Sequence, residues 1–461
     1  MPEHIYRLPW LLLPLVAGCA NAPPGAPAAA FTLPMQWRLV QPADAVTPPE
    51  SLDWQAFGNA ELAALIDEAL AQAPDIAVAM AAERQAEAVA RVAGADRWPA
   101  LDLELSGVRN GGASSGERIA HSASLAASYE IDVWGRQQAL RDAAQAGVEF
   151  SHHDRTALRL SLAANVANLW LGLQALREQI AIAEADWLLV ERTLALTEIR
   201  LRAGSADTLD VARQRGLLGE RQRSLVALRL EYDNGCQALG ALLGRSASVE
   251  PQPADLASLP LPAVNAGLPS ELLRRRPDLA RAEAALLAAD ADVAAARAAL
   301  LPTVSLSASG LAGGRQIADL FANPAYSLFA ALARPIFDGG RLAARHDAEQ
   351  ARREGLLYAY HAAIVAAFAD TQTALNTSAG SAAQLAAQAE VVRQAEIAWQ
   401  RADARYRAGA LAMIDLLDSQ RTLHAARHQL LADRLACQRA AVALFRALGG
   451  GWLHPAREAS S

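Results

Sequence analysis

Apolar residues recur with a helical period through most of the chain. The stretch from Gly135 to Arg202 contains no proline, and its apolar positions alternate spacings of four and three residues. A heptad pattern kept over about six repeats is typical of a coiled coil. At about 1.5 Å per residue, the stretch predicts a helix on the order of 100 Å long. The positions of this seam are Leu162, Val166, Leu169, Leu173, Leu176, Ile180, Ala183, Trp187, Val190, Leu194, Thr197 and Leu201.

Two other regions alternate with a period of two. Leu101, Leu103 and Leu105 alternate with polar residues, a Gly/Ser-rich segment follows, and a second alternating run ends near Ile131. This pattern predicts a β-hairpin over about residues 99–131. The same pattern returns over about residues 302–335, with serines at every second position. Each hairpin would have one apolar face and one face of serine and alanine.

The predicted sheet has two interpretations. In a soluble sandwich its apolar face would meet another sheet, whereas in a membrane it would meet lipid and the small polar face would line water. Four strands cannot close a barrel, because about eight are the practical minimum. The sheet is therefore expected to be shared between chains or covered by helices.

The long helix and its neighbours occur twice. Gly135-Arg136 recurs as Gly340-Arg341, and Arg202-Ala203-Gly204 recurs as Arg407-Ala408-Gly409, both with an offset of 205 residues (340 − 135 and 407 − 202). A constant offset over this distance indicates two copies of one unit with no net insertion between these positions. The fold is therefore expected to be a duplication.

Proline and glycine residues, which end helices and strands, divide the chain into segments. Each copy is expected to contain a helix, a β-hairpin, a very long helix, a tight tip and a return helix, so the fold class is mainly α with a small β part. The first repeat is placed at residues 59–244, with long helices at about 135–203 and 208–244. A Pro-rich linker at residues 245–268 separates it from the second repeat at residues 269–449, with long helices at about 340–408 and 413–448. Residues 450–461 form a C-terminal tail.

The coiled-coil seams of the two copies differ. The first is mostly aliphatic, whereas Ala367, Thr371, Ala374, Ser378 and Ser381 stand at the equivalent positions of the second. Small and polar residues there indicate either a closer approach of the helices or a different facing surface. The pattern does not decide between these two.

The N-terminus carries a signal for export. Arg7 precedes a short apolar stretch, and small residues stand just before Cys19, as in a bacterial lipobox. We expect residues 1–18 to be a signal peptide, Cys19 to carry lipid, and residues 19–58 to form a tether and N-terminal segment. The competing interpretation is a buried helix with a chance cysteine. Ala20 permits sorting to the outer membrane.

Composition agrees with long helices. The 461 residues are rich in Ala, Leu, Arg, Glu and Gln, and aromatic residues make up only 5%. The net charge of −7 gives no support to nucleic-acid binding, for which a basic face is expected. Cys236 and Cys437 are expected to be buried apolar residues, since a disulfide framework is not typical of a chain this large.

Catalytic motifs are lacking in the sequence. It contains no phosphate loop, no paired-cysteine motif and no G-x-S-x-G elbow, so we expect neither an enzyme nor a cofactor. His424 and His428 are four residues apart and share one face of a helix, as metal ligands would. No adjacent acidic residue completes a known motif. We therefore interpret the pair as surface side chains of a coiled coil and assign no metal site.

Four motifs in order resemble a known family. Residues 128–136 read SYEIDVWGR, residues 272–278 read LLRRRPD, residues 335–341 read PIFDGGR, and residues 405–409 read RYRAG. They are similar to the signatures of TolC-like outer-membrane factors, in particular the NodT/OprM-type lipoproteins of RND efflux systems. The resemblance covers essentially residues 50–450.

The resemblance implies an architecture and a role. Three chains would supply 3 × 4 = 12 strands for one barrel in the outer membrane, above a long α-helical barrel in the periplasm. The homotrimer would be the exit duct of a tripartite efflux system, passing small molecules such as drugs from the periplasm to the outside. Its partners would be a periplasmic adaptor, an inner-membrane transporter of the RND type and outer-membrane lipid.

The resemblance also implies a gate at the second tip. Ile414 and Asp418 match the apolar and acidic rings that narrow the periplasmic end, and Arg405 and Tyr406 match contacts that hold the helices closed. A three-fold ring of Asp418 would bring like charges together and favour cations; the alternative is a solvated helix face. Acidic residues also stand at equivalent positions of both copies. These two residues are Asp210 and Asp415.

The two tips are the expected adaptor contacts, because small residues allow partner helices to approach closely. The copies disagree there, since Leu201 stands in place of the tyrosine and Arg213 in place of Asp418. We therefore expect the tips to be inequivalent. The expected contact residues are Arg202, Ala203, Gly204, Arg407, Ala408 and Gly409.

Two other classes compete with a duct. A periplasmic adaptor lipoprotein also has a lipobox and a helical hairpin, but it would have one hairpin flanked by β-domains, and the duplication disfavours it. A structural coiled-coil lipoprotein would not need alternating strands with serine on one face. The sequence indicates neither the cargo nor the particular pump.

Overall fold

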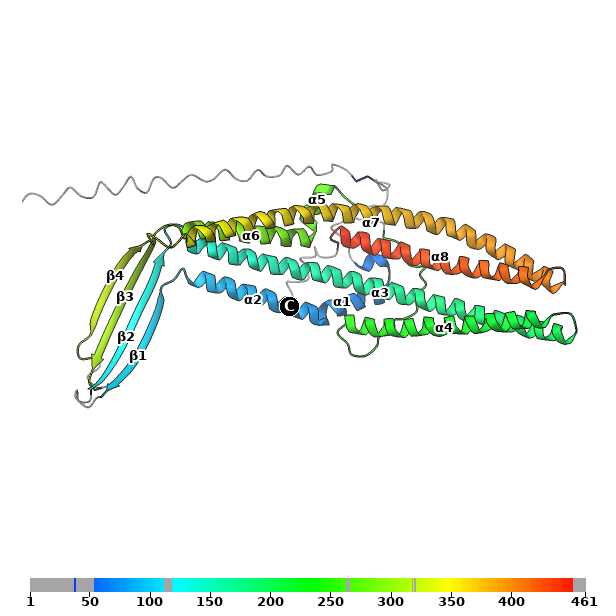
Figure 1. Ribbon diagram of the computed structural model, residues 1–461, viewed down its shortest axis with the longest axis horizontal. Coiled ribbons are helices and arrows are strands. Elements are labelled where there is room, and N and C mark those ends of the chain that lie inside the picture. Colours follow the sequence, from blue (N-terminus) through cyan, green and yellow to red (C-terminus); the bar gives the residue numbers. More distant parts are fainter. Residues whose placement is uncertain are drawn as a thin grey trace, which may run out of the picture.

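The computed structural model describes residues 37–38, 54–111, 118–262, 266–316, 318 and 321–450. The signal peptide, Cys19 and the tail from residue 451 lie outside the described residues. The molecule is long: a β-sheet occupies one end, helices run along the body, and two helical tips form the other end (Figure 1).

The first repeat begins with two consecutive helices and ends with a long antiparallel pair. A 3₁₀ turn, Trp54–Phe57, precedes it. Its elements are α1 (Ala60–Gln72), α2 (Pro74–Ala95), β1 (Ala100–Asn110), β2 (Arg118–Ile131), α3 (Arg136–Arg202) and α4 (Thr208–Leu242).

The second repeat has the same order of elements. They are α5 (Pro269–Arg275), α6 (Pro277–Ala298), β3 (Thr303–Gly314), β4 (Ala325–Ala333), α7 (Arg341–Arg407) and α8 (Met413–Ala447). The long helices α3 and α7 both contain 67 residues, and the return helices α4 and α8 both contain 35. The two hairpins of helices therefore extend equally far from the body.

Proline separates the short helices from the longer ones that follow. Pro74 and Pro277 each occupy the first position of a helix, where the missing N–H costs nothing. The residues before them, Ala73 and Arg276, are extended, as the proline ring requires. The break between helices at Pro74 thus recurs at Pro277 in the second repeat.

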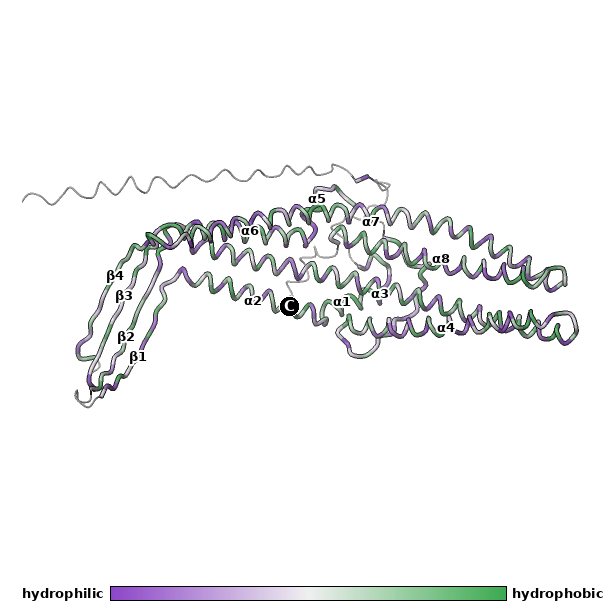
Figure 2. The backbone as a smooth tube through the Cα atoms, in the orientation of Figure 1, coloured by the Kyte–Doolittle hydropathy of each residue, from purple (hydrophilic) through white to green (hydrophobic). Residues whose placement is uncertain are grey.

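The four strands form one antiparallel sheet in the order β1-β2-β3-β4. The register pairs Leu103 with Leu125 and Tyr129 with Leu306, so apolar residues share one face. The opposite face carries serines, which hydrogen-bond across strands at 2.7 Å (Ser106–Ser122) and 2.8 Å (Ser309–Ser327). The alternation is visible along the strands in Figure 2. The predicted faces are confirmed, and β1 and β4 are left as edges.

Each long helix begins at a glycine that follows the sheet. Gly135 and Gly340 adopt φ of 74° and 82°, a region that favours glycine. The carboxylate of Asp132 accepts from the N–H groups of Gln137 and Gln138, and Asp338 does the same for Gly340 and Leu342. These hydrogen bonds explain why both strand-to-helix motifs contain an aspartate just before glycine.

The main core lies midway along the body, where the short helices meet α3 and α8. Trp170 is fully buried and donates from Nε1 to Glu61 Oε2 at 3.1 Å. Trp54, Phe57 and Phe445 pack together, with ring centroids 4.6 Å apart for Trp54 and Phe445. This core fixes the two repeats to each other far from the sheet and from the tips.

The seam of the second repeat faces α8. Thr371 donates to the carbonyl oxygen of Ala447 at 3.3 Å, and Gln388 donates to that of Ala426 at 3.0 Å. These hydrogen bonds join polar residues of the seam directly to the backbone of α8. Within the described residues, Cys236 and Cys437 are buried free thiols, as expected.

No helix of the described part of the chain is both long and apolar enough to cross a bilayer.

Candidate functional site at the helical tips and the sheet

The tips share one backbone turn. Gly204 and Gly409 have φ of 76° and 75° and end α3 and α7. The amide of Gly204 donates to Leu201 O and that of Ser205 to Arg200 O, while Gly409 and Ala410 repeat this pair of bonds in the second tip. Paired bonds of this kind, with glycine in the left-handed region, are a Schellman helix end. The two tips are therefore alike in backbone structure as well as in sequence.

The six expected adaptor-contact residues are all exposed in the chain. They lie at the extreme end of the molecule, opposite the sheet, where the four long helices end (Figure 1). A Cβ added at Gly204 or Gly409 would meet nothing within 4 Å, so only the backbone conformation requires glycine there. The turn is thus compact and open to a partner.

Tyr406 is the buried residue that joins the two tips. Its side chain is 6% exposed and packs with Val190, Leu217, Met413, Leu416 and Leu417, drawn from all four long helices. The guanidinium of Arg200 in α3 lies 4.3 Å from the ring centroid and donates to Tyr406 O at 3.2 Å. Such a cation–π contact stabilises the pairing of α3 with α7.

Arg200 was not among the residues predicted from the sequence. It stands 205 residues before Arg405 and is therefore its counterpart in the first repeat. That offset was the signal that could have found it. Arg405 itself is exposed, so within the chain the contact that closes the tips is made by Arg200.

The acidic residues differ between the tips. Asp210 lies 3.9 Å from Arg213, three residues along the same helix. Asp415 and Asp418 are exposed, and among the described residues neither has an ion-pair partner within the chain. Ile414, four residues before Asp418, is 53% exposed. The second tip therefore presents an apolar and two acidic side chains outward, whereas in the first tip Arg213 stands at the position of Asp418 and lies beside Asp210.

The sheet presents a second exposed surface. Leu101, Leu103 and Leu105 are 66%, 68% and 69% exposed. Large apolar patches on the surface of a chain mark a binding partner or a membrane. The outer sides of β1 and β4 face no further strand among the described residues, and such edges are templates for pairing with another chain.

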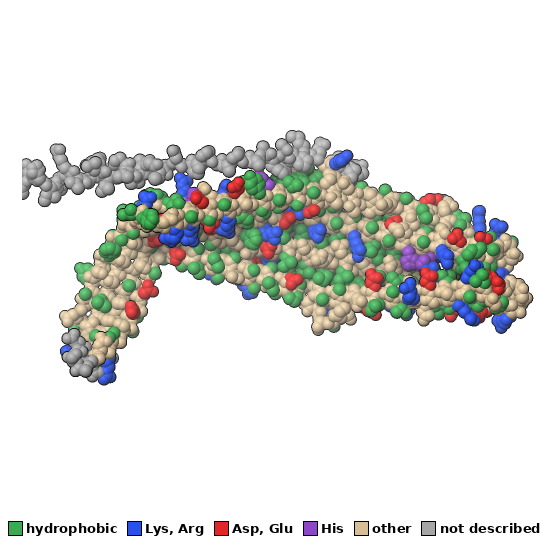
Figure 3. Space-filling model, in the orientation of Figure 1, with side chains coloured by type: hydrophobic (Ala, Val, Ile, Leu, Met, Phe, Trp, Pro, Cys, Tyr) green, Lys and Arg blue, Asp and Glu red, His purple; other side chains and the backbone are tan. Residues whose placement is uncertain are grey.

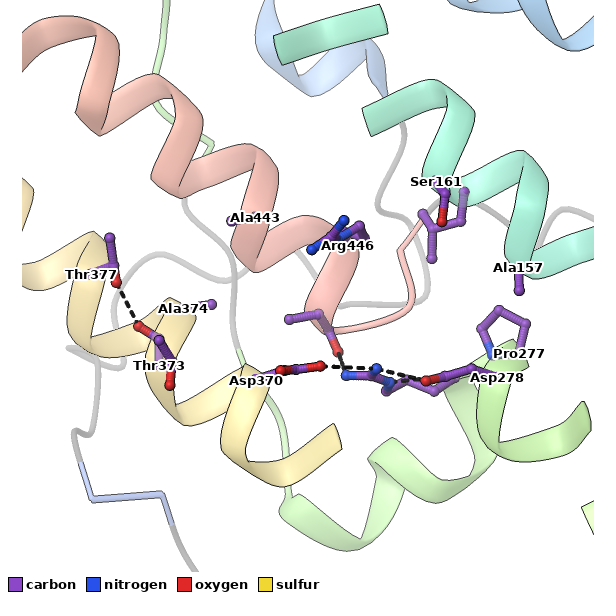
Figure 4. Close-up of a pocket in the computed structure, with 13 residues that line it drawn as sticks. Ala157, Ser161, Pro277, Asp278, Asp370, Thr373, Ala374, Thr377, Ala443 and Arg446 are labelled. Carbon is purple, nitrogen blue, oxygen red and sulfur yellow. Dashed lines mark hydrogen bonds and ion pairs between the residues drawn. The ribbon is translucent and has the colours of Figure 1, made fainter. Parts of the chain in front are cut away.

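A clamp of charges holds the second repeat together beside the core. Arg276, in the LLRRRPD motif, pairs with Asp278 at 2.7 Å and with Asp370 of α7 at 3.4 Å, and donates to Ala447 O of α8. Figure 4 shows these contacts lining a cavity of about 380 Å³ between the helices. Burial disfavours the charge on Asp278, but the hydrogen bond and charge of Arg276 outweigh it and lower its pKa.

The histidine pair is not a solvated surface pair. His424 and His428 in α8 are half-buried, and His424 Nδ1 is hydrogen-bonded to the carboxylate of Asp186 in α3. The expectation of surface side chains is therefore wrong. The acidic neighbour is 238 residues away in sequence, which is why no local motif indicated it.

A family model and two known proteins are similar to nearly the whole chain. The family model described as outer membrane efflux protein matches residues 65–245 and 268–450. The pyoverdine export outer membrane protein OpmQ of Pseudomonas aeruginosa is 41% identical over 453 residues, 95% of each chain. The cation efflux system protein CusC of Escherichia coli (strain K12) is 30% identical over 452 residues, 96% of this chain and 99% of CusC.

Solved structures give the same result. A crystal structure of CusC matches with a TM-score of 0.84 at 29% identity, covering 93% of this chain and 99% of that one. The open state of the Neisseria gonorrhoeae MtrE outer membrane channel matches with a TM-score of 0.83 at 26% identity, covering 92% and 96%.

Proposed function

The chain belongs to the outer membrane efflux protein family, and from this premise we propose that it is the outer-membrane exit duct of a tripartite efflux system. It conducts small molecules passively from the periplasm, and the energy comes from an inner-membrane pump reached through an adaptor. The observation that carries this proposal is the separation of two exposed surfaces: a sheet with unpaired edges at one end and a pair of helical tips at the other. An adaptor is not favoured, because the matched proteins are outer-membrane proteins.

The sheet is proposed to close by trimerisation. Three sheets of four strands give 3 × 4 = 12 strands, which exceeds the practical minimum of about eight for a barrel. Pairing β4 of one chain with β1 of the next would satisfy both edges. The leucine face would then meet lipid and the serine face would line the water-filled interior.

The periplasmic end is proposed to be gated by the second tip. Around a three-fold axis, Ile414 would form an apolar ring and Asp418 an acidic ring, and Asp415 would add charge nearby. Arg405, exposed within one chain, would contact the neighbouring chain, while Tyr406 anchors the tip through Arg200. Asp210 would contribute less charge to the gate, because Arg213 already lies beside it.

Adaptor docking is proposed at both tips. The exposed turns at Arg202–Gly204 and Arg407–Gly409 have the same backbone, so one kind of adaptor helix could meet all six tips of a trimer. The preferred partner transporter is of the RND type. Lipid on Cys19 would hold the N-terminus at the membrane.

The cargo is proposed to be set by the pump rather than by the duct. The names of OpmQ and CusC point to unlike cargo, pyoverdine and cations. A serine-lined face offers hydrogen bonds without a shaped pocket, so it would pass molecules of unlike chemistry.

The proposal is tested by placing one charge on either face of β1. Leu103→Lys puts an ammonium on the leucine face, which costs about 2–4 kcal/mol near the middle of a bilayer. We expect it to deplete heat-sensitive trimers from outer-membrane fractions and to raise drug accumulation in a deletion strain. Glu104→Lys, on the adjacent inward position, is the matched control and is expected to leave trimers and efflux in place.

The duct would be contradicted by a wild-type protein that stays monomeric in the inner membrane. Equal tolerance of the two lysine variants would contradict the assignment of the faces.

A further inference from the structure

Three side chains that can bind metal meet where α3 and α8 cross near the tips. Asp186 comes from α3, and His424 and His428 come from successive turns of α8. One ligand atom from each residue lies within 4.8 Å of the other two, and no other such group occurs in the described part of the chain. Figure 3 shows histidine side chains gathered on this half of the helical body, among arginines and acidic residues.

The site has room and an unused ligand. A cavity of about 110 Å³ adjoins Asp186 and His424, and it is lined by apolar residues of α3 and α4 and by the side chains of Arg221, Arg421 and Arg427. Nε2 of His428 is buried and has no hydrogen-bond partner. The imidazole rings of His424 and His428 pack edge to face with centroids 4.2 Å apart. A buried ring nitrogen without a partner is costly unless it gains one.

We propose that Asp186, His424 and His428 bind a divalent transition-metal ion of the zinc type and thereby clip α8 to α3. Two imidazoles and one carboxylate with a free position are a common ligand set for such ions. Bonds of about 2.0–2.1 Å place tetrahedral ligands about 3.3 Å apart, so small side-chain movements suffice.

Arg221 of α4 competes with the metal. Its guanidinium donates to His424 Nε2 at 2.9 Å, so the proton of neutral His424 resides on Nδ1 and is donated to Asp186. A metal on Nδ1 displaces that proton, which solvent returns to Nε2, and Arg221 must then withdraw. Arg221 therefore keeps the helices joined by hydrogen bonds when metal is scarce and weakens the site by its charge.

The clip would join the two repeats. Asp186 belongs to the first repeat and both histidines belong to the second, which presents Ile414 and Asp418 at its tip. A metal bond between them would restrain any movement of the second hairpin relative to the first. This site does not depend on the duct function, because metal binding is measured without transport.

Titration of the full-length protein in detergent, without a histidine tag and after chelation, tests the site. We expect one Zn²⁺ per chain by calorimetry, and a Co²⁺ complex with visible absorption. His428→Gln and Asp186→Asn should weaken binding at least tenfold. Arg221→Ala should strengthen it about tenfold, because it removes a like charge.

His152→Gln is the matched control. His152 also contacts a carboxylate of another helix, Glu83 at 3.0 Å, but has no third ligand in the described chain. Zn²⁺ should raise the thermal midpoint of the wild type and of this control but not of His428→Gln. Absence of Zn²⁺ binding by the wild type, or an unchanged affinity in His428→Gln, would overturn the proposal.

Discussion

The two helical tips share a backbone and differ in their side chains. Both end a 67-residue helix at a left-handed glycine with the same pair of hydrogen bonds. The second tip has a buried tyrosine and outward Asp418 where the first has Leu201 and Arg213. Duplication has thus kept the backbone that sets the length of the helical hairpins and altered the side chains at their tips. The tips are equivalent as scaffolds and inequivalent as surfaces.

The same contrast extends along the repeats. The seam of α3 is aliphatic, whereas Thr371 and Gln388 of α7 reach backbone carbonyls of α8. Ala73-Pro74-Asp75 of the first repeat corresponds to Arg276-Pro277-Asp278 of the second, so a charged clamp replaces an alanine. At these positions the second repeat therefore uses hydrogen bonds and charge where the first uses apolar side chains, and water can replace such contacts during a movement.

The largest difference between the tips is expected from truncating Tyr406. Tyr406→Ala removes a buried ring and its contact with Arg200, which costs about 3 kcal/mol locally. We expect faster hydrogen exchange at the ends of α7 and α8 and a higher conductance in planar bilayers.

Leu201→Ala is the control in the first repeat. Leu201 is half-buried, so its loss should cost about 1 kcal/mol and leave conductance nearly unchanged. Equal effects of the two truncations would show that the tips are equivalent after all.

The next effect concerns the charged clamp. Arg276→Met keeps the length of the side chain but removes hydrogen bonds to Asp278 and Ala447 O, and we expect a loss of about 2 kcal/mol. The lower thermal midpoint of the detergent-solubilised protein measures it. Ala73→Met is not a suitable control, because Ala73 is buried and a methionine side chain would not fit there. Arg274→Met, in the same motif, is the control. Equal thermal midpoints of Arg276→Met and Arg274→Met would contradict a stabilising role of the Arg276 contacts.

The clamp also predicts a dependence on pH. Because the folded-state pKa of Asp278 is lowered, its contribution is complete above the pKa of an unfolded aspartate, about 4, and is lost as pH falls through the folded value. Asp278→Asn should reduce the loss of thermal stability that the wild type shows below about pH 4. This change in thermal midpoint should be smaller than the one caused by Arg276→Met. Asp75→Asn, at the exposed equivalent position, is the control. A slope unchanged in Asp278→Asn would contradict the assignment.

The helices and strands could be predicted from the sequence because their signals are local. The helix expected at about residues 340–408 is observed as Arg341–Arg407, since glycine marks both of its ends. The strand faces followed from a period of two, which the register of the sheet reproduces. Such signals do not depend on what lies beside the element.

Contacts between helices that are distant in sequence could not be predicted from the sequence. Arg200 and Tyr406 are 206 residues apart, and Asp186 and His424 are 238 apart. Pairing them requires the relative shift of α3 against α7 and α8, which the core around Trp170 fixes and no local pattern encodes. The histidine pair was misinterpreted for this reason.

The smallest expected effect tests the outward charges of the two tips. Asp418→Ala removes an exposed carboxylate that has no ion-pair partner within the described chain, and a three-fold ring of it would repel itself. Interactions of exposed charges are worth up to about 1 kcal/mol, so we expect conductance to rise by no more than about fivefold and cation preference to fall. Arg213→Ala, at the equivalent position, is expected to change neither. Unchanged conductance and selectivity in Asp418→Ala would make Asp418 a solvated helix residue, and Tyr406 would then be the residue by which the two tips differ in function.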